Sequence, residues 1–137
     1  MTEVEHLPAP AVGPIDLRLP ADPSMSKVLR LAASGVASLG GFTVLEIEEI
    51  KLAVSEVLIA LIEHGAGGAI EVQFTVSSDE FGVRGSTSVG ASFDLHHPDL
   101  ALSRVVLDDV CTEHSLGVVT GSELRISASL RRPFAGL

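Results

Sequence analysis

The sequence predicts an α+β two-layer sandwich in which a mixed β-sheet carries its helices on one face. Two long stretches before residue 65 repeat apolar residues every three or four positions, as amphipathic helices do. Shorter stretches such as residues 70–76 alternate apolar and polar side chains, as half-buried strands do. The resulting order, β-α-α-β-β-α-β-β, indicates helices gathered on one side of a sheet.

The first part of the domain is predicted to contain one strand and two helices. Residues 15–19 alternate apolar and polar side chains, which indicates a strand with one buried face. A helix follows from residue 24 to residue 39 and ends before a pair of glycines. Thr43, with a glutamate three residues later, is a candidate N-cap for a second helix that ends at residue 64. Residues 57–62 are apolar nearly all round, so we expect other elements to cover them.

The second part of the domain is predicted to contain two pairs of strands with a short helix between them. The first pair is expected at residues 70–76 and 81–87, and the second at 116–120 and 124–130. The helix is expected at residues 100–110, where apolar side chains recur on one side.

The chain is predicted to form one domain over residues 14–132, with a mobile N-terminal tail at 1–13 and a C-terminal tail at 133–137. Its 137 residues are 46% hydrophobic, which suffices for a core without a disulfide or metal. The single Cys111 cannot form an internal disulfide and fits the reducing cytoplasm. No leader peptide and no apolar run long enough to cross a membrane is recognisable.

The charge balance disfavours nucleic acid as a partner. Nine Lys and Arg stand against 18 Asp and Glu, a formal net charge of −9 that repels phosphate backbones. The chain also has no Trp and no Tyr on which single-stranded bases could stack. A protein partner or a small ligand remains.

Two motifs are weak on inspection. The glycines at 85 and 90 have the spacing of a phosphate-binding loop, but Ala91 stands where that loop needs a lysine. His96 and His97 are adjacent, so their side chains are expected to point apart, and no third histidine or cysteine lies at ligand spacing. We therefore predict no metal site.

Cys111 and Glu56 are more ambiguous. Cys111 has His114 and Asp108 nearby but no sign of a nucleophile turn, so a small buried side chain is the simpler interpretation. Glu56 lies in the middle of an apolar helix, one face of which continues to Glu63. That face is predicted to be a solvated stripe, with a pocket as the alternative.

Two segments carry a family resemblance. Leu29–Phe42 (LRLAASGVASLGGF) and Glu46–Glu56 (EIEEIKLAVSE) closely resemble the anti-sigma factor serine kinases that govern bacterial stress and sporulation sigma factors. That family has the histidine-kinase-like ATPase (Bergerat) fold. The resemblance covers roughly residues 15–130 and continues in Gly90–Asp94 and Leu107–Val110.

The resemblance implies a degenerate ATP site. Glu56 matches the family's catalytic base, but Ala60 replaces the asparagine that holds the magnesium. Ser88 replaces the aspartate that accepts the adenine amino proton, whereas the nearby Gly90 is retained. The lid over the phosphates is reduced to residues 95–102. Mg-ATP, the family cofactor, is therefore expected to bind weakly or not at all, since phosphoryl transfer depends on positioning phosphates and metal.

The resemblance also implies protein partners. Arg30 matches the first-helix arginine with which the family contacts both the sigma factor and the anti-anti-sigma protein. We predict a cytoplasmic, homodimeric anti-sigma-like regulator that binds one or both of these partners, with kinase activity lost or weakened. One alternative is an active serine protein kinase that uses Glu56. Another is a non-catalytic scaffold that dimerises with a kinase-competent relative through its first strand and helix.

Overall fold

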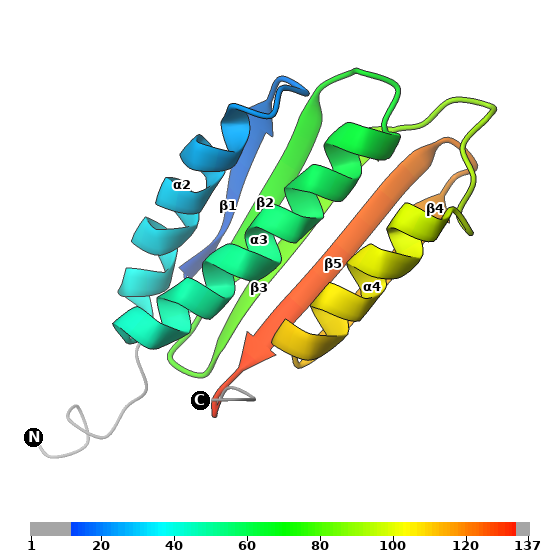
Figure 1. Cartoon of the computed structure of the whole chain (residues 1–137). Coiled ribbons are helices and arrows are strands. Elements are labelled where there is room, and N and C mark those ends of the chain that lie inside the picture. Colours follow the sequence, from blue (N-terminus) through cyan, green and yellow to red (C-terminus); the bar gives the residue numbers. More distant parts are fainter. Residues whose placement is uncertain (1–11, 134–137) are drawn as a thin grey trace, which may run out of the picture.

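The computed structural model describes residues 12–133 as an α+β sandwich with three helices on one face of a five-stranded sheet (Figure 1). The sheet has the order β1-β2-β3-β5-β4. The elements are β1 (Val12–Leu19), α2 (Met25–Leu39), α3 (Val44–His64), β2 (Ile70–Val76), β3 (Glu80–Ser88), α4 (Pro98–Val110), β4 (Glu113–Val119) and β5 (Glu123–Arg131). The predicted element order and the single helical layer are confirmed.

Local signals determine the start of α3 as predicted. The Thr43 hydroxyl accepts a hydrogen bond from the backbone N–H of Glu46 at 3.2 Å, and the Glu46 carboxylate accepts one from the backbone N–H of Thr43 at 2.8 Å. This capping box satisfies two N–H groups that have no partner inside the helix. α3 lies between α2 and α4, so its largely apolar second half is covered by neighbours on three sides (Figure 1).

The sheet is antiparallel throughout, so the expected mixed sheet is wrong in this respect. The connection from β3 to β4 contains the single helix α4, and the two strands run in the same direction. If they were hydrogen-bonded to each other, they would form a parallel pair. β5 lies between them instead. Its side chains at 124, 126, 128 and 130 are all buried, whereas β4 has none buried, so the more apolar strand lies inside the sheet and the less apolar one at its edge.

Several boundaries differ from those predicted. β1 begins at Val12 and pairs there with Val76, so the expected tail ends earlier than residue 13. The rest of that tail, residues 1–11, and residues 134–137 of the expected C-terminal tail lie outside the described residues. α4 begins at Pro98, capped by His97, and β4 begins three residues early because an edge strand needs little apolar alternation.

The helices pack closely on the sheet because small residues lie beneath them. A Cβ at Gly85, in the middle of β3, would lie 2.5 Å from Leu61 Cδ1 and 3.0 Å from Val57 Cγ1. Gly85 therefore serves the packing of α3 against β3. This agrees with the expectation that it is not part of a phosphate-binding loop. Among residues 12–133, no helix combines the length and apolar character needed to cross a membrane.

Candidate functional site

Two of the positions implied by the family resemblance, Glu56 and Ala60, lie along the side of α3 that faces α4. His64, at the C-terminal end of α3, contacts His97, at the N-terminal end of α4, with ring centroids 5.2 Å apart. Glu49, near the other end of α3, lies close enough to Cys111, which follows α4, for its negative charge to raise the pKa of the Cys111 thiol. α4 therefore runs antiparallel along α3. Glu56 and Ala60 lie between these two ends at helical spacing.

The position where the family has its magnesium ligand is buried in this chain. Ala60 is only 1% exposed, and α4 turns inward four buried side chains, Leu100, Ser103, Leu107 and Val110. Glu56, in contrast, is half-buried and forms no hydrogen bond or ion pair with any residue between 12 and 133. The side chain of Glu56 is therefore partly accessible, whereas position 60 is enclosed within the protein.

The two remaining positions lie at the end of β3 and on the connection that follows. Ser88 is exposed, and its carbonyl accepts a hydrogen bond from the backbone N–H of Ala66 at 2.8 Å. Gly90 is exposed too, and its carbonyl accepts one from the N–H of Phe93 at 3.1 Å. Phe93 packs against the core and against His64. The connection thus closes against the end of α3.

These residues do not fit Mg-ATP in the manner of the family. A magnesium ion takes oxygen ligands, and the buried methyl group of Ala60 supplies none. At the position where the family has an aspartate that accepts a hydrogen bond from the adenine amino group, this chain has only the neutral hydroxyl of Ser88. Residues 98–102, part of the expected lid remnant, form the first turn of α4 rather than a lid. Glu56 and Gly90 match their family counterparts, but one carboxylate and one glycine do not position phosphates.

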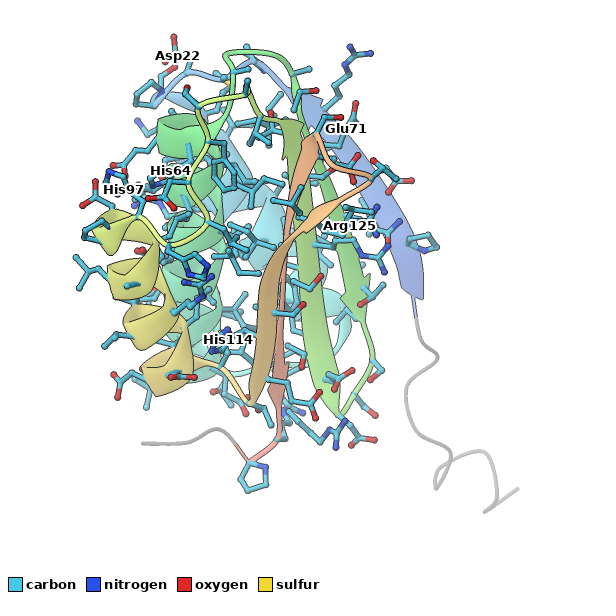
Figure 2. All side chains as sticks on the ribbon, turned by 90° about the vertical axis from the view of Figure 1, so that its right-hand side faces the viewer. Asp22, His64, Glu71, His97, His114 and Arg125 are labelled. Carbon is cyan, nitrogen blue, oxygen red and sulfur yellow. The ribbon has the colours of Figure 1, made fainter. Side chains whose placement is uncertain are left out.

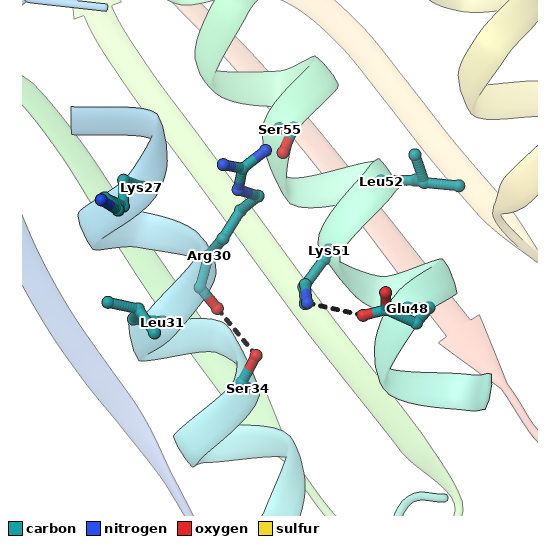
Figure 3. A pocket seen from close by; sticks show the side chains of 8 residues that line it. All are labelled: Lys27, Arg30, Leu31, Ser34, Glu48, Lys51, Leu52 and Ser55. Carbon is teal, nitrogen blue, oxygen red and sulfur yellow. Dashed lines mark hydrogen bonds and ion pairs between the residues drawn. The ribbon is translucent and has the colours of Figure 1, made fainter. Parts of the chain in front are cut away.

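A second candidate region lies between α2 and α3, and it contains Arg30. A hollow of about 520 Å³ opens there between the exposed faces of the two helices (Figure 3). It is lined by Lys27, Arg30, Leu31, Ser34, Glu48, Lys51, Leu52 and Ser55. On α3 the hollow is lined by Glu48, Lys51, Leu52 and Ser55, which lie on a different side of this helix from Ala60.

The hollow combines positive charge with exposed apolar side chains. Lys51 pairs with Glu48, but the side chains of Lys27 and Arg30 form no ion pair with any described residue. Leu31 and Leu52 at its rim are 68% and 55% exposed. Cations and exposed leucines grouped on one face of an acidic protein are typical of a binding surface for a partner.

The structure brings together three residues that the sequence analysis did not combine. One ligand atom from each of His64, His97 and Asp99 lies within 4.8 Å of the others. His64 and His97 are far apart in sequence and meet only because α4 packs along α3 (Figure 2). Sequence spacing gave no signal of this contact.

Cys111 agrees with its predicted role as a small buried side chain. Burial, assisted by the negative charge of Glu49, raises the pKa of its thiol to about 12. The imidazole of His114 is bound to the Asp108 carboxylate at 2.6 Å. Since a nucleophilic cysteine must form a thiolate near neutral pH, this site is not suited to covalent catalysis.

Sequence comparison identifies relatives of this chain. It is 40% identical over 85 residues to a protein named serine-protein kinase RsbW from Listeria monocytogenes serovar 1/2a, covering 59% of this chain and 54% of the relative. Over this stretch the chain is similar to the RsbW serine-protein kinases. RsbW from Bacillus subtilis strain 168 is 37% identical over 84 residues, covering 58% and 52% of the two chains. No protein-family model matches the chain.

The RsbW matches confirm the predicted resemblance to the serine kinase family, and the observed architecture is consistent with the histidine-kinase-like ATPase fold. Each match spans little more than half the length of the RsbW relative. The similarity therefore concerns this domain, and the activity and partners of this chain are separate questions.

Proposed function

We propose that this chain is a regulatory protein of the anti-sigma type that binds a sigma factor, an anti-anti-sigma protein, or both, through the face formed by α2 and α3. The observation that carries this proposal is the unpaired Arg30 in the hollow between these helices. The RsbW relatives support the same family of partners.

The chemistry of the hollow specifies the partner segment that would fit it. Lys27, Arg30 and Lys51 bring three of the chain's nine basic residues to one hollow. Leu31 and Leu52 offer apolar contact area beside them. A segment with carboxylates on one side and apolar side chains on the other complements both features, and an arginine fork can bind a carboxylate through two parallel hydrogen bonds.

Replacing Arg30 by alanine is expected to weaken the partner complex by roughly 1–4 kcal/mol, a value typical of interface hot spots. The melting temperature should hardly change, because an exposed arginine without an ion pair contributes little to folding. The measurement is calorimetric titration or a pull-down with candidate sigma and anti-anti-sigma proteins, together with a melting curve.

Arg84→Ala is the matched control for this experiment. Arg84 is also an exposed arginine, but it lies on β3 with its side chain on the sheet face opposite the helices. It should leave binding unchanged. Equal losses in the two variants would indicate general electrostatic attraction, and no loss in Arg30→Ala would place the interface elsewhere.

We further propose that Mg-ATP binding is lost or much weakened. Each missing polar contact, at Ala60 and at Ser88, should cost on the order of 1–3 kcal/mol of binding free energy. Calorimetric titration of the purified protein with Mg-ATP and Mg-ADP should therefore give no saturable binding in the micromolar range. Micromolar affinity would contradict this part of the proposal.

An active serine protein kinase is the second candidate function. It is favoured by the similarity to proteins named serine-protein kinases and by Glu56, which is half-buried and without an ion pair among the described residues. Incubation with labelled ATP and candidate anti-anti-sigma proteins separates the two functions. Phosphate transfer that Glu56→Gln abolishes would establish the kinase, whereas partner binding unaffected by Glu56→Gln supports a non-catalytic regulator.

Self-association is the remaining part of the proposal. β1 is an edge strand whose outer side is unpaired within the described chain, and α2 lies next to it (Figure 1). Pairing between two β1 strands would extend the sheet across a homodimer or across a dimer with a related kinase. Co-purification from cells distinguishes these two dimers.

A further inference from the structure

The residues His64, His97 and Asp99 form a compact cluster at the junction of α3 and α4 (Figure 2). One imidazole nitrogen of each histidine and one carboxylate oxygen of Asp99 lie within 4.8 Å of one another. Bond lengths of about 2.0–2.2 Å in a tetrahedral zinc site place neighbouring ligand atoms about 3.3–3.6 Å apart. Side-chain rotations of the order of an ångström would therefore bring all three onto one ion.

His64 supplies an independent reason to regard the cluster as a ligand site. Its Nε2 atom is buried and has no hydrogen-bond partner among the described residues. Buried polar atoms in folded proteins nearly always have a partner, because an unpaired one costs the free energy of its lost hydration. The ring is held in place by edge contacts with Phe93 and His97, with centroids 6.4 Å and 5.2 Å away.

His97 already presents a nitrogen without a proton. Its Nδ1 accepts a hydrogen bond from the backbone N–H of Asp99 at 3.0 Å, so this atom carries a lone pair. The same Nδ1 is 3.8 Å from Oδ2 of Asp99, which places two of the three ligand atoms side by side. Metal binding at Nδ1 would replace the hydrogen bond that caps α4. The bonds from His97 and Asp99 to the metal would then fix the first turn of α4 in its place.

The ligand set determines the class of metal. Two imidazole nitrogens and one carboxylate oxygen suit Zn²⁺ and neighbouring divalent transition metals, whereas Mg²⁺ and Ca²⁺ prefer oxygen ligands alone. The formal net charge of −9 favours accumulation of any cation at the surface, and the C-terminal end of α3 adds the negative end of a helix dipole. Three protein ligands leave a fourth position open to water or to a partner's side chain.

We infer that His64, His97 and Asp99 bind a divalent transition metal ion of the zinc type, which links the end of α3 to the start of α4. This site is distinct from the magnesium position of the family, which corresponds to Ala60 one turn earlier on α3. It also departs from the sequence-based expectation of no metal, which considered His97 only beside His96. The inference is independent of partner binding at Arg30.

The test is zinc binding to the full chain, freed of any histidine tag and treated with chelator. Calorimetric titration with ZnCl₂ should show saturable uptake at low micromolar concentration or tighter, and Co²⁺ should give the visible absorption of a tetrahedral site. MgCl₂ should give no signal. Zinc should also raise the melting temperature, because a ligand of the native state stabilises it.

His64→Ala and His97→Ala should each lower zinc affinity at least about tenfold, a change expected even for residues that only support a metal ligand. His96→Ala is the matched control, since His96 is the adjacent exposed histidine and is not a member of the cluster. It should leave zinc affinity and the zinc-dependent melting shift unchanged. Absence of saturable uptake by the wild-type protein, or equal losses in His96→Ala and His64→Ala, would overturn the inference.

Discussion

Ala60→Asn is expected to lower the free energy of unfolding by about 2–4 kcal/mol and to leave Mg-ATP binding as weak as before. The substitution restores the residue type that the family uses as its magnesium ligand. In this chain, however, position 60 is 1% exposed and lies in the buried core. The larger side chain would overfill a packed interface, and its amide would be buried without a partner, each at a cost of about 1–3 kcal/mol.

The control is Ala101→Asn on α4. Ala101 is exposed, so the same change there costs only the lower helix propensity of asparagine, less than about 1 kcal/mol. Urea unfolding gives the stability of both variants, and calorimetry gives their affinity for Mg-ATP. Tight nucleotide binding by Ala60→Asn would mean that α4 moves aside readily and that the nucleotide site persists beneath it. A stability loss equal to that of Ala101→Asn would mean that the two helices are not closely packed at this position.

Local sequence signals predicted the helices well because their ends are determined by residues close in sequence. The Thr43 cap and the glycine pair after residue 39 fixed α2 and α3 nearly to the residue. The strands were located too, but the pairing of the sheet was not. Strand order depends on which strand has the more apolar face, and that comparison between β4 and β5 involves the whole sheet.

The candidate sites were predictable only in part, for the same reason. A family match located Glu56, Ala60, Ser88 and Arg30 by position, but it gave no information on what covers them. The burial of Ala60 results from the packing of the whole core, and the contact between His64 and His97 results from the antiparallel packing of two helices. Such contacts join residues that are distant in sequence. Periodicity and motif spacing describe only residues that are close in sequence, so they do not predict these contacts.

Arg132 is another residue that sequence alone placed only at the edge of the predicted domain. Its guanidinium donates two hydrogen bonds to the Glu46 carboxylate, at 2.8 and 3.0 Å. It donates two more, to the carbonyls of Gly41 at 2.7 Å and Ser78 at 3.0 Å. It also stacks on the Phe42 ring, 4.2 Å from its centroid. The end of β5 is thereby joined to the start of α3 and to the turn between β2 and β3.

Arg132→Ala is expected to lower the free energy of unfolding at pH 7 by about 2–4 kcal/mol, because it leaves the half-buried Glu46 and two carbonyls without their donor. Arg131→Ala is the matched control. Arg131 is 59% exposed and pairs with Glu80 at the surface, so its loss should cost less than about 1 kcal/mol. Denaturant unfolding of the two variants beside the wild-type protein measures the difference.

The effect of Arg132→Ala should also depend on pH. The hydrogen bonds from Arg132 hold the pKa of Glu46 below its ordinary value of 4.5 in the folded protein. A carboxyl group whose pKa is lowered by folding stabilises the native state above its unfolded pKa, and this contribution is lost as pH falls through the folded pKa. The stability gap between wild type and Arg132→Ala should therefore be full at pH 6–7 and narrow below about pH 4.5. A gap that stays constant down to pH 3 would show that Arg132 acts through Phe42 and the two carbonyls rather than through the charge of Glu46.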